Sequence, residues 1–236
     1  MASAEQIQAI LKAHAKEFHA VVPFDPSRDR LYLFDFTSDN KELRPEEIAD
    51  TERFANYINQ TLRAHGARYG IGGYGEHRTL YARSRHFDTE EEPRRLHLGI
   101  DIWGPAGTAV RAPLDGIVHS FAFNNNDSDY GATLILTHNI GGVGFHILYG
   151  HLSLNSIKNL FGGQHVGKGE VIAEFGMRFE NGNWPPHLHF QLIIDMEGWK
   201  GDYPGVCKFS EREKWLANCP DPDLVLGMMR YADVAG

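Results

Sequence analysis

The sequence predicts an α+β protein in which a predominantly antiparallel β-sheet follows an N-terminal helical region. Apolar residues recur at helical spacing before residue 68, whereas short apolar runs separated by Gly, Pro, Asn and Asp take over from about Tyr69. A length of 236 residues with 42% hydrophobic residues fits one globular domain with a small appendage. We therefore divide the chain into an N-terminal helical cap, residues 1–68, and a β-rich domain, residues 69–236.

The N-terminal region is expected to hold two helices with a strand between them. Ser3 and Gln6 are spaced as a capping box at the start of a helix over residues 3–20. The apolar run 31–36 is a strand candidate. A second helix begins near Pro45, a residue favoured in the first turn, and ends at Gly66.

The β-rich region is expected to supply about six strands, enough for a sheet with its own core. Glycines or polar loops bound several of these runs, which lie at residues 109–112, 116–123, 132–137, 144–149, 171–175 and 188–194. Beyond them, a tail of aromatic and turn residues includes one short apolar helix near its end.

Composition and charge exclude several function classes. A formal net charge of -8 provides no basic surface for nucleic acid or an anionic membrane. No apolar run approaches the ~20 residues of a membrane helix, and the first residues lack a signal-peptide core. We expect a cytoplasmic protein that binds neither nucleic acid nor membrane, with Cys207 and Cys219 as free thiols. The oligomeric state is left open.

Histidine is the unusual component of this chain. Eight of the thirteen histidines lie between His97 and His189. In a strand, His187 and His189 project from the same side because alternate side chains share a face. His97 and Asp101, four residues apart, also share a side if that segment is extended, and an imidazole beside a carboxylate suits zinc.

The metal interpretation depends on several short motifs occurring together. A single histidine beside apolar residues is more often packed and hydrogen-bonded, so that role is assigned to His119, His138, His146 and His165. An H-x-x-x-D pair, a histidine after Tyr-Gly and an H-x-H in one β-rich segment favour a metal site. Three protein ligands leave a fourth zinc position open, as a hydrolase requires.

Other sequence motifs do not lead to a function. Gly70–Gly75 matches G-x-G-x-x-G, but the βαβ context of a dinucleotide site is missing, so a flexible loop is predicted there. No H-E-x-x-H helix, Walker A loop or G-x-S-x-G elbow occurs.

From about residue 97 to about residue 194, the motifs resemble those of the lysostaphin/LytM-type zinc metallopeptidases, which share the duplicated hybrid motif fold. HLGIDIWGPAGTAVRAPLDGIV is similar to the first metal motif of that family, and YGHLS and PPHLHFQL are similar to the second and third. The resemblance implies that His97, Asp101 and His189 are zinc ligands. It also implies that His151 and His187 are the two catalytic histidines outside the ligand set.

The activity implied by this resemblance is hydrolysis of a peptide or amide bond by metal-activated water. The substrate would be a murein-derived or Gly-rich peptide, or a small amide. More loosely, the flanking stretches GIGGYGEHRTLYARSRHF and WLANCPDPDLVLG resemble a cytoplasmic branch whose domains are fused to aminoglycoside-kinase-like and aminotransferase domains.

Alternatives to a cytoplasmic peptidase follow from the same motifs. One is a wall hydrolase whose signal peptide is missing from this sequence or whose export is unconventional. Another is a non-catalytic scaffold or regulator of the same fold, although all five site residues are retained. A phosphohistidine carrier ranks last, because it gives Asp101 no role. The region before Tyr69 could also occlude the site as a latent cap.

Overall fold

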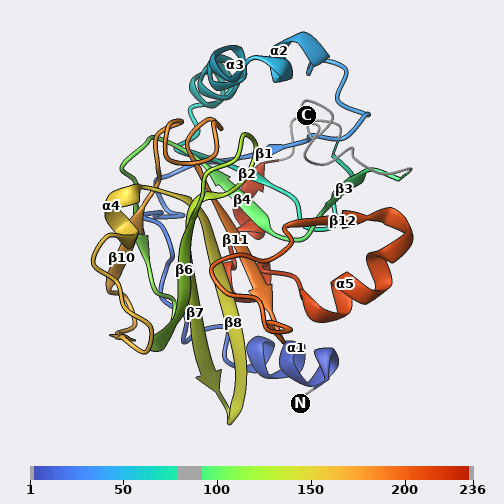
Figure 1. Ribbon diagram of the computed structural model, residues 1–236. Coiled ribbons are helices and arrows are strands. Elements are labelled where there is room, and N and C mark those ends of the chain that lie inside the picture. Colours follow the sequence, from blue (N-terminus) through green and yellow to red (C-terminus); the bar gives the residue numbers. More distant parts are fainter. Residues whose placement is uncertain (1–2, 79–91, 234–236) are drawn as a thin grey trace.

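The computed structural model describes residues 3–78 and 92–233, arranged around one large twisted sheet (Figure 1). Nine strands form this sheet, in the order β13 (Ala232–Asp233), β1 (Leu31–Phe34), β2 (Tyr69–Gly72), β4 (Ile100–Trp103), β11 (His187–Ile193), β8 (Val143–Leu152), β7 (Gly131–Ile140), β6 (Gly116–Asn124) and β9 (His165–Val166). The pairs β13–β1 and β1–β2 are parallel, and the other pairs are antiparallel. The predicted α+β class with a mainly antiparallel sheet is confirmed.

Two small ladders flank the sheet. β5 (Ala109–Arg111) pairs with β10 (Val171–Glu174), and β3 (Arg94–His97) pairs with β12 (Val206–Lys208), which comes from the C-terminal tail. All six predicted strands exist, but among the described residues the prediction missed β2, β3, β4, β9, β12 and β13. The tail strand β12 thereby fixes the segment that ends at His97.

The Gly-rich stretch at 70–75 is partly a strand, which corrects the predicted loop. Gly70 and Gly72 belong to β2, which pairs with β1 and β4. A Cβ at Gly70 would lie 2.1 Å from a ring carbon of Phe34, so close packing of the neighbouring strand requires glycine.

The first predicted helix is shorter than expected, and the second is broken. α1 (Ala4–Ala13) has the predicted Ser3–Gln6 capping box but ends seven residues early. The second is divided into α2 (Pro45–Ala49) and α3 (Thr51–Ala64), because the Asp50 carboxylate accepts a hydrogen bond from the backbone N–H of Arg53 and starts a new helix. The remaining helices are α4 (Leu154–Ile157), α5 (Arg212–Asn218) and α6 (Asp223–Leu226), with 3-10 turns at Phe209–Glu211 and Met229–Tyr231.

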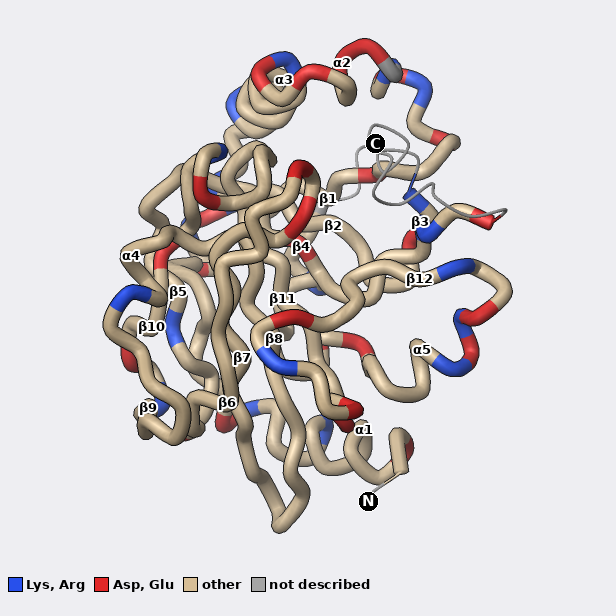
Figure 2. Tube along the Cα trace, in the orientation of Figure 1, with Lys and Arg blue, Asp and Glu red and all other residues tan. Residues whose placement is uncertain are grey.

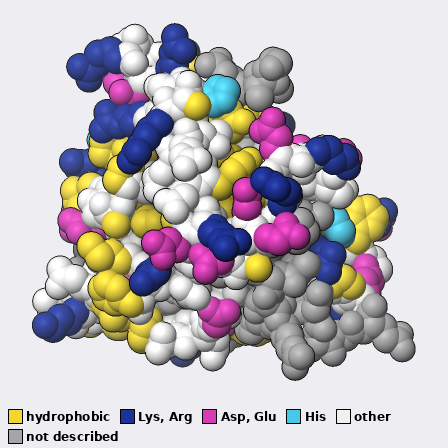
Figure 3. Space-filling model, turned by 90° about the horizontal axis from the view of Figure 1, so that it is seen from above, with side chains coloured by type: hydrophobic (Ala, Val, Ile, Leu, Met, Phe, Trp, Pro, Cys, Tyr) yellow, Lys and Arg dark blue, Asp and Glu magenta, His cyan; other side chains and the backbone are white. Residues whose placement is uncertain are grey.

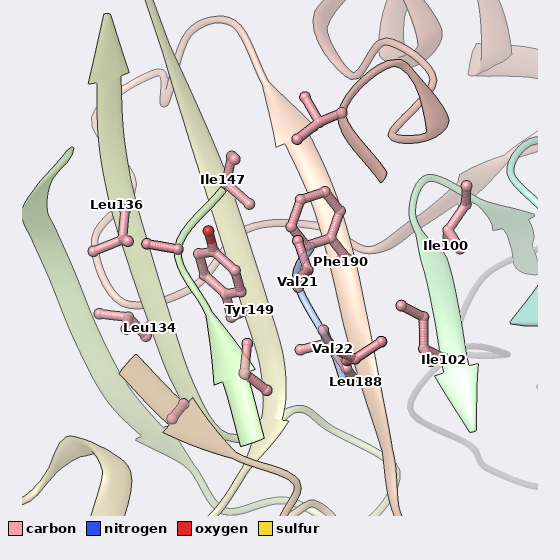
Figure 4. Packing of buried hydrophobic residues seen from close by; sticks show 14 of the residues in the cluster. Val21, Val22, Ile100, Ile102, Leu134, Leu136, Ile147, Tyr149, Leu188 and Phe190 are labelled. Atoms are coloured by element: carbon pink, nitrogen blue, oxygen red, sulfur yellow. The ribbon is translucent and has the colours of Figure 1, made fainter. Parts of the chain in front are cut away.

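One face of the central strands is mainly hydrophobic and forms the main core (Figure 4). Alternate residues of each strand point to this face. They pack against Val21 and Val22, and they come in pairs from four strands: Ile100 and Ile102, Leu188 and Phe190, Ile147 and Tyr149, and Leu134 and Leu136. Asp101 and His189 lie between these pairs in the sequence, so the same alternation directs their side chains to the opposite face.

That opposite face is covered by the two ends of the chain. The C-terminal tail packs Tyr203, Cys207 and Cys219 against Ile135 and Leu148 of the sheet. Both cysteines are buried free thiols, as predicted. A third cluster joins the region before residue 69 to the sheet through aromatic rings, with Phe36 and Phe54 each packed edge-on against Trp103.

The region before residue 69 is joined to the sheet by strand pairing. β1 lies between β2 and β13, and α3 packs its buried side chains Phe54, Ile58 and Leu62 into the aromatic cluster. The division of the chain at residue 68, and the idea that residues 1–68 form a latent cap, stay predictions.

Charged side chains lie mainly outside the sheet. The tube in Figure 2 is free of acidic and basic colour along β7, β8 and β11, whereas α2, α3 and α5 carry both signs. Seen from above, basic and acidic side chains are interspersed with hydrophobic ones (Figure 3). Within residues 3–78 and 92–233, no helix is long and apolar enough to cross a membrane. The cytoplasmic location stays a prediction.

Candidate metal and catalytic centre

The candidate site lies on the sheet face opposite the core of Figure 4. Asp101 is in β4 and His189 is directly opposite it in β11, since the two are Cα partners in the antiparallel pair. His97 ends β3, and the turn at Leu98 and Gly99 leads directly into β4. The predicted proximity of His97 and Asp101 is therefore found, but by a turn between two strands and not by one extended segment.

Glycine at position 99 allows this turn to pass close to the histidine. A Cβ there would lie 2.5 Å from His189 Cε1 and 2.9 Å from the carbonyl oxygen of Phe190. Backbone would therefore have to move if position 99 carried a side chain, and the approach of His97 to His189 depends on this glycine.

Three polar atoms converge at the centre of the site. His97 Nε2 lies 3.0 Å from His189 Nδ1 and 3.4 Å from Asp101 Oδ1, and His189 Nδ1 lies 3.1 Å from the same oxygen. All three residues are buried. They are the group of His, Cys, Asp and Glu side chains that could hold a metal ion among the described residues.

The outer hydrogen bonds indicate which ring nitrogens are protonated. His97 Nδ1 donates to the carbonyl oxygen of Gly73 at 3.1 Å, and His189 Nε2 donates to Gln191 Oε1 at 2.8 Å. With these tautomers the inward-facing nitrogens carry lone pairs, and together with Asp101 Oδ1 they present three acceptor atoms to one point. Asp101 Oδ1 lies 3.1 Å from His189 Nδ1, so without a metal ion a proton on that nitrogen would fill the same place.

This donor set fits zinc. Two ligand atoms at tetrahedral zinc–nitrogen distances are about 3.3 Å apart, close to the three separations found here. Two imidazoles and one carboxylate are zinc ligands of ordinary type, and three protein ligands leave a fourth position for substrate or water. A cation in this position would also satisfy the three mutually repelling lone pairs.

The ionisation of these groups suits metal binding. Burial, together with the charge of Arg78, lowers the pKa of His97 to about 4, so its imidazole is neutral at pH 7. Burial opposes ionisation of Asp101, but its interactions with His97 and with the charged guanidinium of Arg78 outweigh it and hold the pKa of this carboxyl well below its usual value. The set therefore presents neutral imidazole and carboxylate, the forms that bind metals.

His151 reaches the site through a β-bulge. On β8, Tyr149 faces the hydrophobic core, so regular alternation would send His151 to the core as well. The pairing with β7 shifts instead, with Leu152 opposite Ala132 and Tyr149 opposite Leu134. Gly150 and His151 thus oppose one residue, and His151 adopts a φ of 62°. This bulge turns the imidazole toward His187, with ring centroids 4.0 Å apart.

Backbone carbonyls orient both remaining histidines. His151 Nδ1 donates to the carbonyl of Asn181 at 2.8 Å, and His187 Nδ1 donates to that of Pro185 at 2.8 Å. The lone pair of each ring is then on Nε2, on the other side of the ring. Trp103 stacks on His187, with centroids 3.9 Å apart and planes 15° apart. Both rings are thereby held in place before any substrate arrives.

Burial keeps these two histidines uncharged. It lowers the pKa of His187 to about 4, and it holds the pKa of His151 well below its usual value, aided by the neighbouring His187. At pH 7 each Nε2 can therefore accept a proton or a hydrogen bond.

A cavity of about 340 Å³ opens beside these groups. Asp101, His151, His187 and His189 line one side of it. The remaining walls come from Arg78, Arg94 and Trp103, from the loop at 126 and 128–130, from Trp184, and from the C-terminal tail at 199 and 202–206. Such a volume accommodates a small ligand or a few residues of a peptide.

The structure brings all five predicted site residues together, since four line the cavity and His97 contacts two of them. Sequence reasoning missed the residues that hold them, among them Gln191, Asn181 and Arg78. Gln191 follows the H-x-H pair by two residues on the same strand face, and that spacing was the available signal for it. No comparable sequence signal marks Asn181 or Arg78.

The geometry thus defines a class of protein: a metal-binding hydrolase domain on an antiparallel sheet. Comparison with known families shows that residues 95–200 match peptidase family M23, in agreement with the resemblance of the motifs. The matched region includes His97, Asp101 and His189, so the family match and the donor set agree on zinc as the cofactor.

Two curated relatives have similar sequences. The DD-carboxypeptidase/endopeptidase Mpg of Neisseria meningitidis is 36% identical over 101 residues, which cover 43% of this chain and 21% of the relative. An uncharacterized metalloprotease of Haemophilus influenzae is 31% identical over 143 residues, covering 61% of this chain and 28% of the relative. The chain thus spans about a fifth to about a quarter of the length of these relatives.

Solved structures include the catalytic domain of the antimicrobial peptidase lysostaphin from Staphylococcus simulans. The two chains superpose with a TM-score of 0.40 and 21% sequence identity, over 68% of this chain and 96% of the lysostaphin domain.

Proposed function

We propose that the chain is a zinc-dependent peptidase that hydrolyses a peptide or amide bond of a short substrate, with His97, Asp101 and His189 as metal ligands. The single observation that supports this most strongly is the convergence of two imidazole nitrogens and one carboxylate oxygen, 3.0–3.4 Å apart, in a buried site. Zinc, when bound, supplies the Lewis acidity that amide hydrolysis requires.

His151 and His187 are the proposed catalytic residues. Both line the cavity, and each has Nδ1 bound to a backbone carbonyl. One ring accepts the proton of the attacking water at Nε2 and then, as an imidazolium, delivers that proton to the leaving amine. The other ring stabilises the developing oxyanion when its own Nε2 carries a proton. The carbonyl contacts leave Nε2 of both rings as the site of proton transfer.

The substrate we propose is a murein-derived or Gly-rich peptide, or a small amide. Support comes from the printed activity of the Neisseria relative, a DD-carboxypeptidase/endopeptidase, and from the limited cavity volume of about 340 Å³. Aromatic rings of Tyr130, Trp184 and Tyr203 line this cavity and offer flat surfaces to a peptide backbone.

The test begins with the metal content of protein purified without added metal. We expect about one zinc per chain in the wild type and far less in His189→Ala, since three ligands are needed to hold the ion. His138→Ala is the matched control, because His138 is a buried histidine of β7 that hydrogen-bonds the carbonyl of Asp115.

Hydrolysis is then followed by mass spectrometry on wall fragments, on glycyl peptides and on small glycyl amides. Cleavage that zinc restores after chelation supports the proposal. A wild type that binds no zinc, even when zinc is added, contradicts it and favours a non-catalytic binding module.

A further inference from the structure

Arg78 is a buried cation in contact with the metal centre. Its side chain is 1% exposed, and its guanidinium donates through Nη1 to Asp101 Oδ2 and through Nε to Glu76 Oε2, the latter at 2.6 Å. Arg78 also lines the cavity beside His187 and His189. Arg78 and Glu76 lie outside residues 95–200, so the M23 match does not include them.

The two oxygens of Asp101 have separate tasks. Oδ1 faces His97 Nε2 at 3.4 Å and His189 Nδ1 at 3.1 Å, whereas Oδ2 accepts the hydrogen bond from Arg78. A carboxylate held this way cannot rotate about its Cβ–Cγ bond without breaking the charge-assisted bond to the guanidinium. Only one oxygen is therefore directed at the metal position.

Glu76 balances the charge of Arg78. A guanidinium beside a metal site would repel a divalent cation, but its ion pair with Glu76 makes the two side chains neutral together. Glu76 is held in turn, because its other oxygen accepts the backbone N–H of Phe36 at 3.1 Å. The ring of Phe36 also lies beneath the guanidinium, 5.3 Å from its central carbon.

Close packing keeps the guanidinium in position. A Cβ at Gly72 would lie 2.8 Å from Arg78 Nη2, so the absence of a side chain on this part of β2 leaves the space that the guanidinium occupies. The backbone N–H of Arg78 donates to the carbonyl of Arg95, which ties the segment to β3 two residues before His97. Both contacts fix Arg78 relative to two strands of the site.

We propose that Arg78 is a positioning residue of the metal centre, which holds Asp101 as a ligand through one oxygen, and that Glu76 neutralises it. The inference rests on the proposed metal site. It extends that site beyond the M23 region, because the chain Phe36–Glu76–Arg78–Asp101 begins in the segment that follows β1. Partners of this kind typically affect metal affinity by about 10- to 100-fold.

The experiment compares Arg78→Met and Arg78→Lys with the wild type. The zinc dissociation constant is measured by competition with a coloured chelator, and the visible spectrum of the Co²⁺-loaded protein reports the coordination number. We expect zinc affinity to fall by about 10- to 100-fold in Arg78→Met and by less in Arg78→Lys, which keeps the charge but not the fork geometry. The cobalt bands should weaken in both, because a released carboxylate can bind through two oxygens.

Arg68→Met is the matched control. Arg68 forms an ion pair with Asp29 at 3.0 Å and lies over the ring of Tyr69, so its loss also removes a cation from an ion pair and an aromatic contact. We expect this variant to bind zinc and cobalt as the wild type does. Circular dichroism of the metal-free proteins establishes that each is folded, and if Arg78→Met does not fold, Arg78→Lys decides the question.

The outcomes separate this inference from the proposed function. A wild type that binds no zinc overturns the function itself. A wild type that binds zinc, beside a folded Arg78→Lys of unchanged affinity and unchanged cobalt spectrum, overturns only the role of Arg78. Tighter zinc binding after loss of Arg78 would also overturn it, since Arg78 would then be a competitor for Asp101.

Discussion

The same sheet holds histidines in two different environments. Near the junction of β4, β8 and β11, His151, His187 and His189 line one cavity and His97 contacts His189, and we call these four the cavity group. The outer histidines, His119, His138 and His146, lie on β6, β7 and β8 away from the cavity. Burial does not separate the groups, because His138 is as buried as His187. Hydrogen bonding of one ring nitrogen does not separate them either, since His138 Nδ1 donates to the carbonyl of Asp115 at 2.9 Å.

What separates them is the direction of the second nitrogen. In the cavity group, His97 Nε2 and His189 Nδ1 meet the oxygen of Asp101, and His151 and His187 line the cavity. Away from the cavity, His119 of β6 and His146 of β8 lie 5.1 Å apart between ring centroids, and each bonds a hydroxyl, on Ser120 and Thr137. A metal or catalytic role therefore requires convergence on a carboxylate or a cavity, and histidine content alone does not define it.

The largest effect should come from the two proposed catalytic histidines. We expect His151→Ala and His187→Ala each to lower kcat by about 10²- to 10⁴-fold, the usual contribution of a general acid or base. Zinc content should remain at the wild-type level, because neither ring is a proposed ligand. Steady-state kinetics on the substrate found in the first screen, with metal analysis of the same samples, provides the measurement.

His138→Ala again serves as the comparison, because it removes a buried imidazole from the same sheet. It should lower stability but leave kcat within a few-fold of the wild type. Loss of zinc from His151→Ala would contradict the division of roles, and so would an unchanged kcat in both catalytic-site variants.

A smaller effect is expected at Gln191, which distinguishes His189 from the outer histidines. Gln191 Oε1 accepts from His189 Nε2, and its amide group donates to the carbonyl of Pro204 at 3.1 Å, which fixes the amide orientation. Gln191→Leu should therefore weaken zinc binding by about 10-fold, because His189 is no longer held in the tautomer with a free Nδ1.

Gln191→Glu tests the same point by rescue. It keeps an acceptor for His189 Nε2, so its zinc affinity, measured by chelator competition, should stay nearer the wild type than that of Gln191→Leu. Equal affinities for the leucine and glutamate variants would show that the acceptor at this position has no role in metal binding.

Much of the site could be predicted because its residues lie in short local patterns. The H-x-H pair needs only the alternation of one strand. HLGID resembles a family motif, although His97 and Asp101 come close only because a turn joins β3 to β4. The second helix was predicted unbroken because its apolar stripe is continuous, whereas the Asp50 side chain caps a new helix within it. The first helix was predicted too long and ends at Ala13.

The remaining features depend on contacts that are distant in sequence. His151 faces the cavity only because the pairing of β7 and β8 shifts by one residue, and no local pattern around YGHLS encodes that bulge. Arg78 contacts Asp101 across 23 positions, and Glu76 contacts Phe36 across 40. The parallel pairing of β1 with β2 and β13 likewise joins the two ends of the chain.

The smallest expected effect concerns His146, an outer histidine, and it appears in stability. Burial, with the neighbouring His119, lowers the pKa of His146 from 6.5 to about 4. Between these pH values the unfolded chain binds a proton that the folded chain does not, so the unfolding free energy falls as pH decreases from 6.5 to 4. His146 is half-buried and solvent screens its charge, so we expect its share of this loss to be about 1 kcal/mol.

Urea unfolding of the wild type and of His146→Asn at pH 7.5 and pH 4.5 measures this share. The wild type should lose more stability than His146→Asn between the two pH values. A variant at an exposed histidine, His165→Asn, should lose as much as the wild type. Equal losses in wild type and His146→Asn would mean that the fold leaves the protonation of His146 unperturbed, and the outer histidines would then differ from the cavity group in solvation as well as in direction.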